Sequence, residues 1–236
     1  MGERPALQPR LRAIADLVPA GSRLADIGTD HGYIPIDLLL AGRITAAIAT
    51  DIGELPLDHA RRTAQRCGLT AGIDFRLGDG LMPVSPGEVD VIVIAGMGGD
   101  NIAAILSAAH WAREGPLLLL QPMSKAEVLR SFLPENGFAV EAECLVADKG
   151  KLYPILTVRG GEMPPATAAE AWGGFSLQDD PLWGLYLEDR LLRLRRAAAG
   201  LARARDSTAE VRREELRGVI EALESKRKEW ELACRK

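Results

Sequence analysis

The sequence is poor in the residues that build disulfide frameworks and metal centres. Its three cysteines, Cys67, Cys144 and Cys234, lie far apart and form no Cys-x-x-Cys motif. The three histidines, at positions 31, 59 and 110, are equally scattered along the chain. Disulfide frameworks need an even set of cysteines, and zinc sites need ligands at short, regular spacings. We therefore expect neither a disulfide-stabilised fold nor a metal site.

Long apolar runs are also missing. A membrane-spanning helix needs about 20 predominantly apolar residues, whereas the longest largely apolar stretches, such as 89–95 and 117–120, have the length of a strand. Residues 1–20 contain three arginines but lack the apolar core of a signal peptide. The sequence therefore predicts a cytoplasmic protein that has no membrane partner.

Acidic and basic residues are distributed unevenly along the chain. The net charge is −4, but residues 185–236 hold 14 Lys/Arg against 10 Asp/Glu, which leaves the preceding part of the chain at −8. An acidic body thus carries a basic tail. A solvated helical surface is the simplest explanation of such a tail, and contact with a nucleic-acid backbone is the alternative.

Short apolar segments alternate with helical patterns through about residue 159. Apolar runs that lack polar alternation, such as 46–49 and 91–94, are typical of strands covered on both faces. The alternation predicts an α/β fold, with a largely parallel sheet and helices on both of its faces. Strands are expected at 23–27, 44–50, 73–77, 89–95, 116–121, 138–147 and 152–158, the last two as an antiparallel edge hairpin. Helices are expected at 7–17, 34–41, 54–67, 99–110 and 124–135.

The pattern changes after residue 160. Glycine and proline pairs mark residues 161–181 as a linker. From residue 182 onward, apolar residues recur at three- and four-residue steps, which predicts two long helices folded back as an antiparallel coiled-coil hairpin. The expected domains are therefore residues 1–160, with a Rossmann-like sheet, and a helical extension at 182–236.

Small, acidic or glycine residues end four successive predicted strands. These are Asp26-Ile27-Gly28, Asp51, Gly78-Asp79-Gly80 and the stretch from Ala95 to Gly99. In an open parallel sheet, ligands bind beyond the carboxyl ends of the strands. Four such ends in succession predict a ligand pocket there.

The spacing of these residues indicates which cofactor binds. Asp26-x-Gly28-x-x-x-Gly32 resembles the acidic-x-Gly-x-Gly-x-Gly motif of S-adenosylmethionine sites, with Asp30 in place of the middle glycine. Asp51 is placed to accept the ribose hydroxyls, although a helix cap is the alternative, and Asp79 to accept the adenine amine. The Gly-x-Gly-x-x-Gly turn of NAD sites is absent, which disfavours an oxidoreductase. The predicted cofactor-binding residues are Asp26, Gly28, Thr29, Asp51, Ile52, Asp79, Gly80, Ala95, Gly96 and Met97.

Two longer stretches, 26–35 (DIGTDHGYIP) and 93–99 (VIAGMGG), closely resemble the TrmK-type tRNA (adenine-N1)-methyltransferases. Shorter matches, LQP at 120–122, KGKLY at 149–153 and DPLW at 180–183, extend the resemblance over nearly the whole chain. The resemblance implies a class I methyltransferase fold, S-adenosylmethionine as cofactor, and methylation of adenine N1 at position 22 of tRNA, in the D-arm region.

Three residues beside the cofactor motif are candidates for the catalytic site. Asp30 could stabilise charge that develops on the adenine, or it could cap the helix that begins near residue 33. His31 could contact substrate or only hold the loop, and Tyr33 could stack on the adenine or pack in the core. The Asn/Asp-Pro-Pro-aromatic segment of many amino-directed methyltransferases is absent from 96–99, so we do not expect its backbone-carbonyl mechanism.

Several residues are expected to contact tRNA, because basic side chains neutralise phosphates and aromatic rings stack on bases. An ordinary polar hairpin near residue 150, or a helical dimerisation surface, are the alternatives, and the oligomeric state stays open between a monomer and a dimer formed through the C-terminal helices. The candidates are Gln121, Pro122, Lys149, Lys151, Tyr153, Arg190, Arg193, Arg196 and Arg203. A methyltransferase for another RNA or a small molecule, and a non-catalytic RNA-binding module, are the competing functions.

Overall fold

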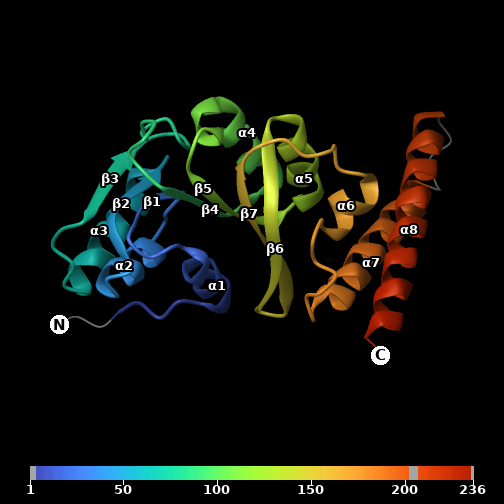
Figure 1. The fold of residues 1–236 in the computed structure, drawn as a ribbon, viewed down its shortest axis with the longest axis horizontal. Coiled ribbons are helices and arrows are strands. Elements are labelled where there is room, and N and C mark those ends of the chain that lie inside the picture. Colours follow the sequence, from blue (N-terminus) through green and yellow to red (C-terminus); the bar gives the residue numbers. More distant parts are fainter. Residues whose placement is uncertain (1–3, 202–206, 235–236) are drawn as a thin grey trace.

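The computed structural model describes residues 4–201 and 207–234, and its centre is one seven-stranded sheet (Figure 1). The strand order is β3-β2-β1-β4-β5-β7-β6. The first five strands in this order run parallel, whereas β7 is antiparallel to both β5 and β6. The strands are β1 Ser22–Ile27, β2 Ile44–Asp51, β3 Ile73–Leu77, β4 Val91–Gly98, β5 Leu117–Ser124, β6 Phe138–Asp148 and β7 Lys151–Gly160. The Rossmann-like sheet and the antiparallel edge hairpin expected from the sequence are confirmed.

Helices cover both faces of the sheet because the strand side chains alternate between them. Leu24 of β1 packs with α1 and α2 on one face, whereas its neighbours Ala25 and Ile27 pack with α4 and α5 on the other. All three side chains are essentially inaccessible to solvent. The helices of this part of the chain are α1 Pro9–Leu17, α2 Tyr33–Leu40, α3 Glu54–Arg66, α4 Gly99–Ala108 and α5 Ala126–Glu135.

Two segments depart from the sequence expectation. The helix expected over 99–110 ends at Ala108 and continues as the 3₁₀ turn η1, His110–Arg113. The segment 161–181, expected to be a linker, contains the helix α6, Ala168–Gly173. Thr167 and Glu170 form a capping box in which each side chain accepts the other residue's backbone N–H, which stabilises this short helix.

The C-terminal helices α7, Trp183–Leu201, and α8, Ser207–Ala233, lie side by side at the end of the molecule opposite β3 (Figure 1). They run antiparallel, since Arg195 pairs with Glu224 at 2.6 Å and Glu188 pairs with Arg227 at 3.8 Å. The expected two-helix extension is confirmed, and coiled-coil packing along it stays a prediction. Within the described residues, no helix is long and apolar enough to cross a membrane.

A buried ion pair fastens this extension to the sheet domain. Arg130 of α5 and Glu143 of β6 have side chains with no solvent exposure, and Arg130 Nε donates to Glu143 Oε1 at 2.7 Å. The same guanidinium donates to the Ala171 carbonyl at 3.0 Å and to the Tyr186 hydroxyl at 3.2 Å. The Arg130 guanidinium thus links α5 to β6, α6 and α7. These hydrogen bonds hold the extension in a fixed position relative to the sheet.

Candidate functional site

The candidate site lies at the carboxyl ends of the parallel strands, at the point where the order of the strands in the sheet reverses. Strand β1 pairs with β2 on one side and with β4 on the other, so the connections that leave β1 and β4 lead to opposite sides of the sheet, to β2 and to β5. A crevice forms at such a switch point because the two flanking connections run to opposite sides. Two cavities occupy this crevice, and both are lined by Gly28.

The larger cavity has a volume of about 760 Å³, which lies within the usual range for small-molecule sites. It collects residues from the ends of β1, β2, β3 and β4, although these are distant in sequence. Of the predicted cofactor-binding residues, it is lined by Gly28, Asp51, Ile52, Asp79, Gly80 and Met97. Asn101 and Ile105 of α4 and Trp111 of η1 also line it, and the sequence analysis missed all three.

The smaller cavity has a volume of about 310 Å³ and lies on the other side of Gly28. It brings together the remaining predicted cofactor residues and all three catalytic candidates. These lining residues are Asp26, Thr29, Asp30, His31, Tyr33, Ala95 and Gly96. The strand-end pattern therefore located both halves of one crevice.

Gly28 occupies a position whose backbone conformation favours glycine. Its φ is +70°, in the left-handed region that favours glycine. A Cβ at this position would lie 2.2 Å from Met97 Cε, far inside contact distance. The turn after β1 thus packs directly against the Met97 side chain at the wall of the larger cavity, and Gly28 itself lines both cavities.

Asp26 is a buried carboxyl group at the end of β1. Its residue is only 6% exposed, and its carboxylate accepts a hydrogen bond from the Thr29 hydroxyl at 2.6 Å. Burial raises the pKa of Asp26 to about 6; the Thr29 hydrogen bond opposes this shift and the nearby Asp51 charge adds to it. A buried carboxyl with a raised pKa in a crevice is a typical feature of a functional site.

Asp51 holds the loop after β2 and does not cap the following helix. Its Oδ1 accepts the Gly53 N–H at 3.0 Å, and its Oδ2 lies 3.4 Å from the Asp30 N–H. Helix α3 begins at Glu54 with Gly53 as its N-cap, and no side chain caps it. The cap interpretation of Asp51 is therefore wrong, and its carboxylate faces the larger cavity.

Asp30 likewise does not cap a helix. Gly32 is the N-cap of α2, and no side chain completes the cap. Asp30 instead has a φ of +50°, which is strained for a residue with a side chain, and its carboxylate is 66% exposed. The neighbouring His31 ring stacks on Tyr33, with 5.2 Å between centroids and 15° between planes. The capping alternative is wrong, and an exposed carboxylate lies beside a pair of stacked rings.

Arg10 of α1 is a cavity residue that the sequence analysis missed. Its Nη1 donates to Gln121 Oε1 at 2.5 Å, and its guanidinium lies 6.0 Å from the centre of the Tyr153 ring. Burial lowers the pKa of Arg10, and the Asp148 charge works against this shift. The Arg10–Gln121 contact joins residues 111 positions apart, so no local pattern reveals it.

The structure contradicts direct tRNA contact for several predicted residues. Gln121 is fully buried, and its Oε1 accepts from both Arg10 and the Gly96 N–H. Pro122 is buried beside it, and Tyr153 is only 8% exposed. Gln121 thus positions Arg10 and the Gly96 turn instead of reaching solvent.

Arg190 is a further correction, because its side chain is buried and its charge is paired within the protein. The residue is 8% exposed; its guanidinium lies 4.9 Å from the centre of the Tyr186 ring and pairs with Asp189. Arg193 pairs with the same Asp189 at 3.0 Å but is 53% exposed, and Arg196 is exposed. These two remain available to a polyanion, and Arg203 lies outside the described residues.

Lys149 and Lys151 are exposed at the turn between β6 and β7. Leu120 of β5 pairs with Leu156 of antiparallel β7, so the turn that precedes β7 lies beyond the carboxyl end of β5 at Ser124. Lys149 itself has a φ of +47°, in keeping with a tight turn. Both lysines therefore project at the same edge of the sheet as the crevice.

Comparison with known proteins agrees with this arrangement. Residues 7–156 match the family described as "Methyltransferase domain", so the sheet and its crevice are those of a Rossmann-like methyltransferase. The chain is also 34% identical, over 182 residues, to the tRNA (adenine(22)-N(1))-methyltransferase of Bacillus subtilis, an alignment that covers 77% of this chain and 74% of that protein. The chain belongs to the tRNA (adenine(22)-N1)-methyltransferase family.

Solved structures resemble nearly the whole fold, including the C-terminal helices. The M1A22 tRNA methyltransferase TrmK of B. subtilis superposes with a TM-score of 0.85 at 30% identity, covering 94% of this chain and 99% of that one. A putative tRNA (m1A22) methyltransferase of Streptococcus pneumoniae, in complex with S-adenosyl-L-methionine, superposes with a TM-score of 0.82 at 31% identity, covering 94% and 100%.

Proposed function

We propose that this protein transfers a methyl group from S-adenosylmethionine to N1 of adenine 22, in the D-arm region of tRNA. The observation that carries the proposal is the pair of cavities joined at Gly28. The larger cavity offers carboxylates and apolar walls suited to a nucleoside. The smaller cavity offers an exposed carboxylate and stacked rings suited to the acceptor base. The family supplies the nucleotide position, and the crevice supplies the means of binding both reactants.

The residues present suit the cofactor. Asp51 would accept the ribose hydroxyls and Asp79 the adenine amine in the larger cavity, while Gly28 lets the backbone approach closely. At the junction with the smaller cavity, the Asp26 carboxylate would hold the ammonium of the methionyl end. Arg10, which lines the same cavity, would hold its carboxylate.

When bound, S-adenosylmethionine supplies a methyl group on a sulfonium, which is a good leaving group. The protein's task is consequently to align and desolvate the acceptor. N1 of neutral adenine carries a free lone pair, so bond formation needs no base, and the positive charge ends on the adenine ring. Tyr33, supported by the stacked His31 ring, would orient the unpaired base by stacking, and Asp30 would stabilise the cationic ring.

The tRNA would lie across the crevice edge and the helical extension. Lys149 and Lys151 project at that edge, and Arg193 and Arg196 are exposed on α7. Their contacts would be to phosphates, so affinity would fall as salt concentration rises. In this account residues 1–160 hold the chemistry, 161–181 connect, and 182–236 help to hold tRNA.

The protein would act as a monomer in the cytoplasm, where tRNA is modified. Leu187, Leu194 and Leu223 of α7 and α8 are buried in one cluster with Leu145 of the sheet, whereas Leu192 and Val211 are exposed. A second copy is not needed to cover the buried cluster. Dimerisation through exposed positions of these helices is the competing arrangement.

The competing functions share this fold and differ in which molecule is methylated, or in whether any methyl transfer occurs. Incubation of the full chain with labelled S-adenosylmethionine, and with bulk tRNA, ribosomal RNA or small acceptors in separate reactions, distinguishes them. We expect incorporation into tRNA alone. Preferential labelling of another acceptor would indicate a different methyltransferase, and cofactor binding without any transfer would favour a non-catalytic RNA-binding module.

A further inference from the structure

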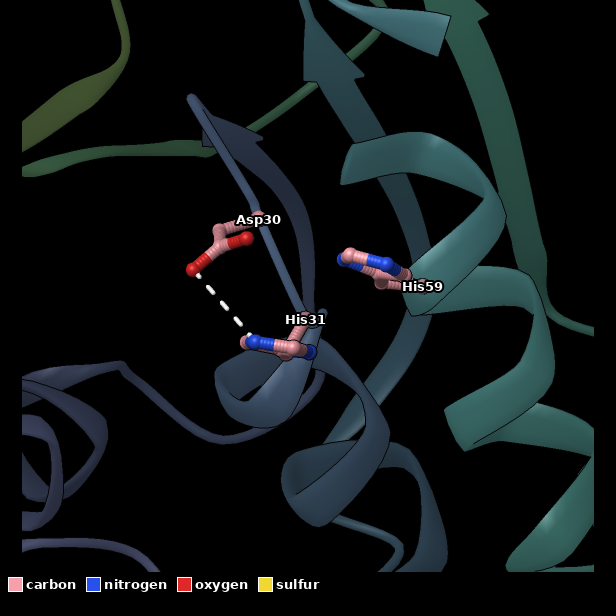
Figure 2. Close-up of side chains that lie close together, drawn as sticks. All are labelled: Asp30, His31 and His59. Atoms are coloured by element: carbon pink, nitrogen blue, oxygen red, sulfur yellow. Dashed lines mark ion pairs between the residues drawn. The ribbon is translucent and has the colours of Figure 1, made fainter. Parts of the chain in front are cut away.

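Three potential metal ligands converge beside the smaller cavity, two of them adjacent in sequence and the third 28 residues further on. Asp30 and His31 lie on the loop after β1, and His59 lies on α3 (Figure 2). Each offers one ligand atom, and these atoms all lie within 4.8 Å of one another. The Asp30 carboxylate is 3.7 Å from His31 Nε2. The fold thus assembles a donor set that linear spacing does not predict.

The backbone of the loop after β1 and its packing against α3 hold this donor set in place. Asp30 and Gly32 both have positive φ, at +50° and +66°, which makes the loop turn sharply and presents residues 30 and 31 together. A Cβ on Gly32 would lie 3.1 Å from the Ala60 Cβ. The loop is therefore packed closely on α3 at the residue next to His59.

Two imidazoles and a carboxylate are ligands that Zn²⁺ and similar divalent transition metals prefer. A zinc ion with bonds of about 2.0–2.2 Å needs ligand atoms roughly 3.3–3.5 Å apart. Binding would therefore draw the groups together by about 1 Å. The His31 and His59 rings are now stacked, 5.1 Å between centroids and 10° between planes, so one ring must also turn. The His31 side chain is 40% exposed and the Asp30 side chain 66%, which leaves room for this motion.

We propose that Asp30, His31 and His59 bind one divalent transition-metal ion of the Zn²⁺ class, and that this ion inhibits methyl transfer. The ion would inhibit the reaction because Asp30 and His31 line the smaller cavity, where the adenine is proposed to bind. His59 lines neither cavity, so its replacement removes a metal ligand without changing the lining of either cavity. A bound cation would occupy the carboxylate and place positive charge where the adenine ring must become cationic. The inhibitory effect rests on the proposed function; the binding site does not.

Direct binding is tested with the metal-free full chain carrying Cys234→Ser, which removes an exposed thiol. Titration with Co²⁺, followed by its visible absorption, and with Zn²⁺, followed by calorimetry, should give one equivalent bound. His59→Ala should weaken binding roughly tenfold or more, because it removes a metal ligand. His110→Ala, which changes the remaining histidine in the 3₁₀ turn, is the matched control and should bind normally. If the protein binds no metal, or if His59→Ala and His110→Ala lose metal affinity equally, the proposed site is wrong.

The inhibitory effect has a separate readout. Zn²⁺ should slow methyl transfer by the wild type, EDTA should restore it, and His59→Ala should transfer at the wild-type rate with or without the ion. Zinc binding that leaves the wild-type rate unchanged would refute the inhibition. Zinc binding in a protein that methylates no tRNA would keep the site and refute the proposed function, so the two failures are distinguishable.

Discussion

Cofactor affinity should depend on pH through Asp26. Its pKa is raised to about 6 because the carboxyl group is buried, and the group is proposed to hold the cationic ammonium of the cofactor. The ionised form is the one that attracts a cation, so affinity should rise as pH increases through 6. At pH 5 about one carboxyl in eleven is ionised, which predicts roughly tenfold weaker binding than at pH 7, or about 1.4 kcal/mol.

The assay is calorimetric titration with S-adenosylhomocysteine at constant ionic strength from pH 5 to pH 7, below the titration of an α-amino group. Asp26→Asn should bind more weakly at pH 7 and show a much flatter profile. Asp90→Asn, which changes a half-exposed carboxylate paired with Arg23, is the control and should keep the wild-type slope. A flat profile in the wild type, or an undiminished slope in Asp26→Asn, would refute the assignment.

The raised pKa of Asp26 also makes the stability of the folded protein depend on pH. A carboxyl whose pKa is raised on folding contributes stability that is present below the unfolded pKa and is lost as pH rises through the folded value. Between about pH 4 and pH 6 the cofactor-free protein should therefore lose stability at Asp26. Chemical denaturation should show Asp26→Asn gaining relative to the wild type over this range, by at most about 3 kcal/mol. Parallel stability curves for the two proteins would contradict the raised pKa.

Four further variants test other parts of the account. Asp51→Ala should weaken cofactor binding about 10- to 100-fold, since hydrogen bonds to a charged acceptor contribute about 1.5–3 kcal/mol; wild-type affinity by calorimetry would refute the ribose assignment. Asp30→Ala should lower the single-turnover rate roughly tenfold or more while cofactor affinity is kept, and an unchanged rate would exclude its electrostatic role. Glu143→Gln should lower the free energy of unfolding by about 3–5 kcal/mol, because it leaves a buried guanidinium without a charged partner; a loss below 1 kcal/mol by urea denaturation would contradict the buried ion pair. Lys149→Ala with Lys151→Ala should reduce the salt dependence of tRNA binding by about one to two phosphate contacts, and an unchanged slope would place tRNA elsewhere.

The strand-end residues were predictable because chain order and sheet geometry suffice to bring them together. Asp26 and Asp51 each follow an apolar run, and the carboxyl ends of parallel strands meet at one edge of a sheet. Their partners were not predictable in the same way. Arg10 reaches the crevice from the first helix and is held there by Gln121, a contact that only the tertiary fold creates.

Some errors had visible signals. The helix α6 begins with Thr167 and Glu170, a Thr-x-x-Glu capping box, but the surrounding glycines and prolines favoured a linker. Arg190 lies three residues after Leu187 and four before Leu194, on the apolar face of its helix, and that spacing predicts its burial. Charge alone pointed to tRNA, and periodicity was the better guide.

The most direct test of the central claim is labelled-methyl transfer to a single unmodified tRNA transcript, followed by nucleoside analysis. The account predicts a 1-methyladenosine peak from the transcript with adenine at position 22, and no label when that adenine is replaced by guanine. Labelling that persists after the replacement, or a labelled nucleoside other than 1-methyladenosine, would contradict it.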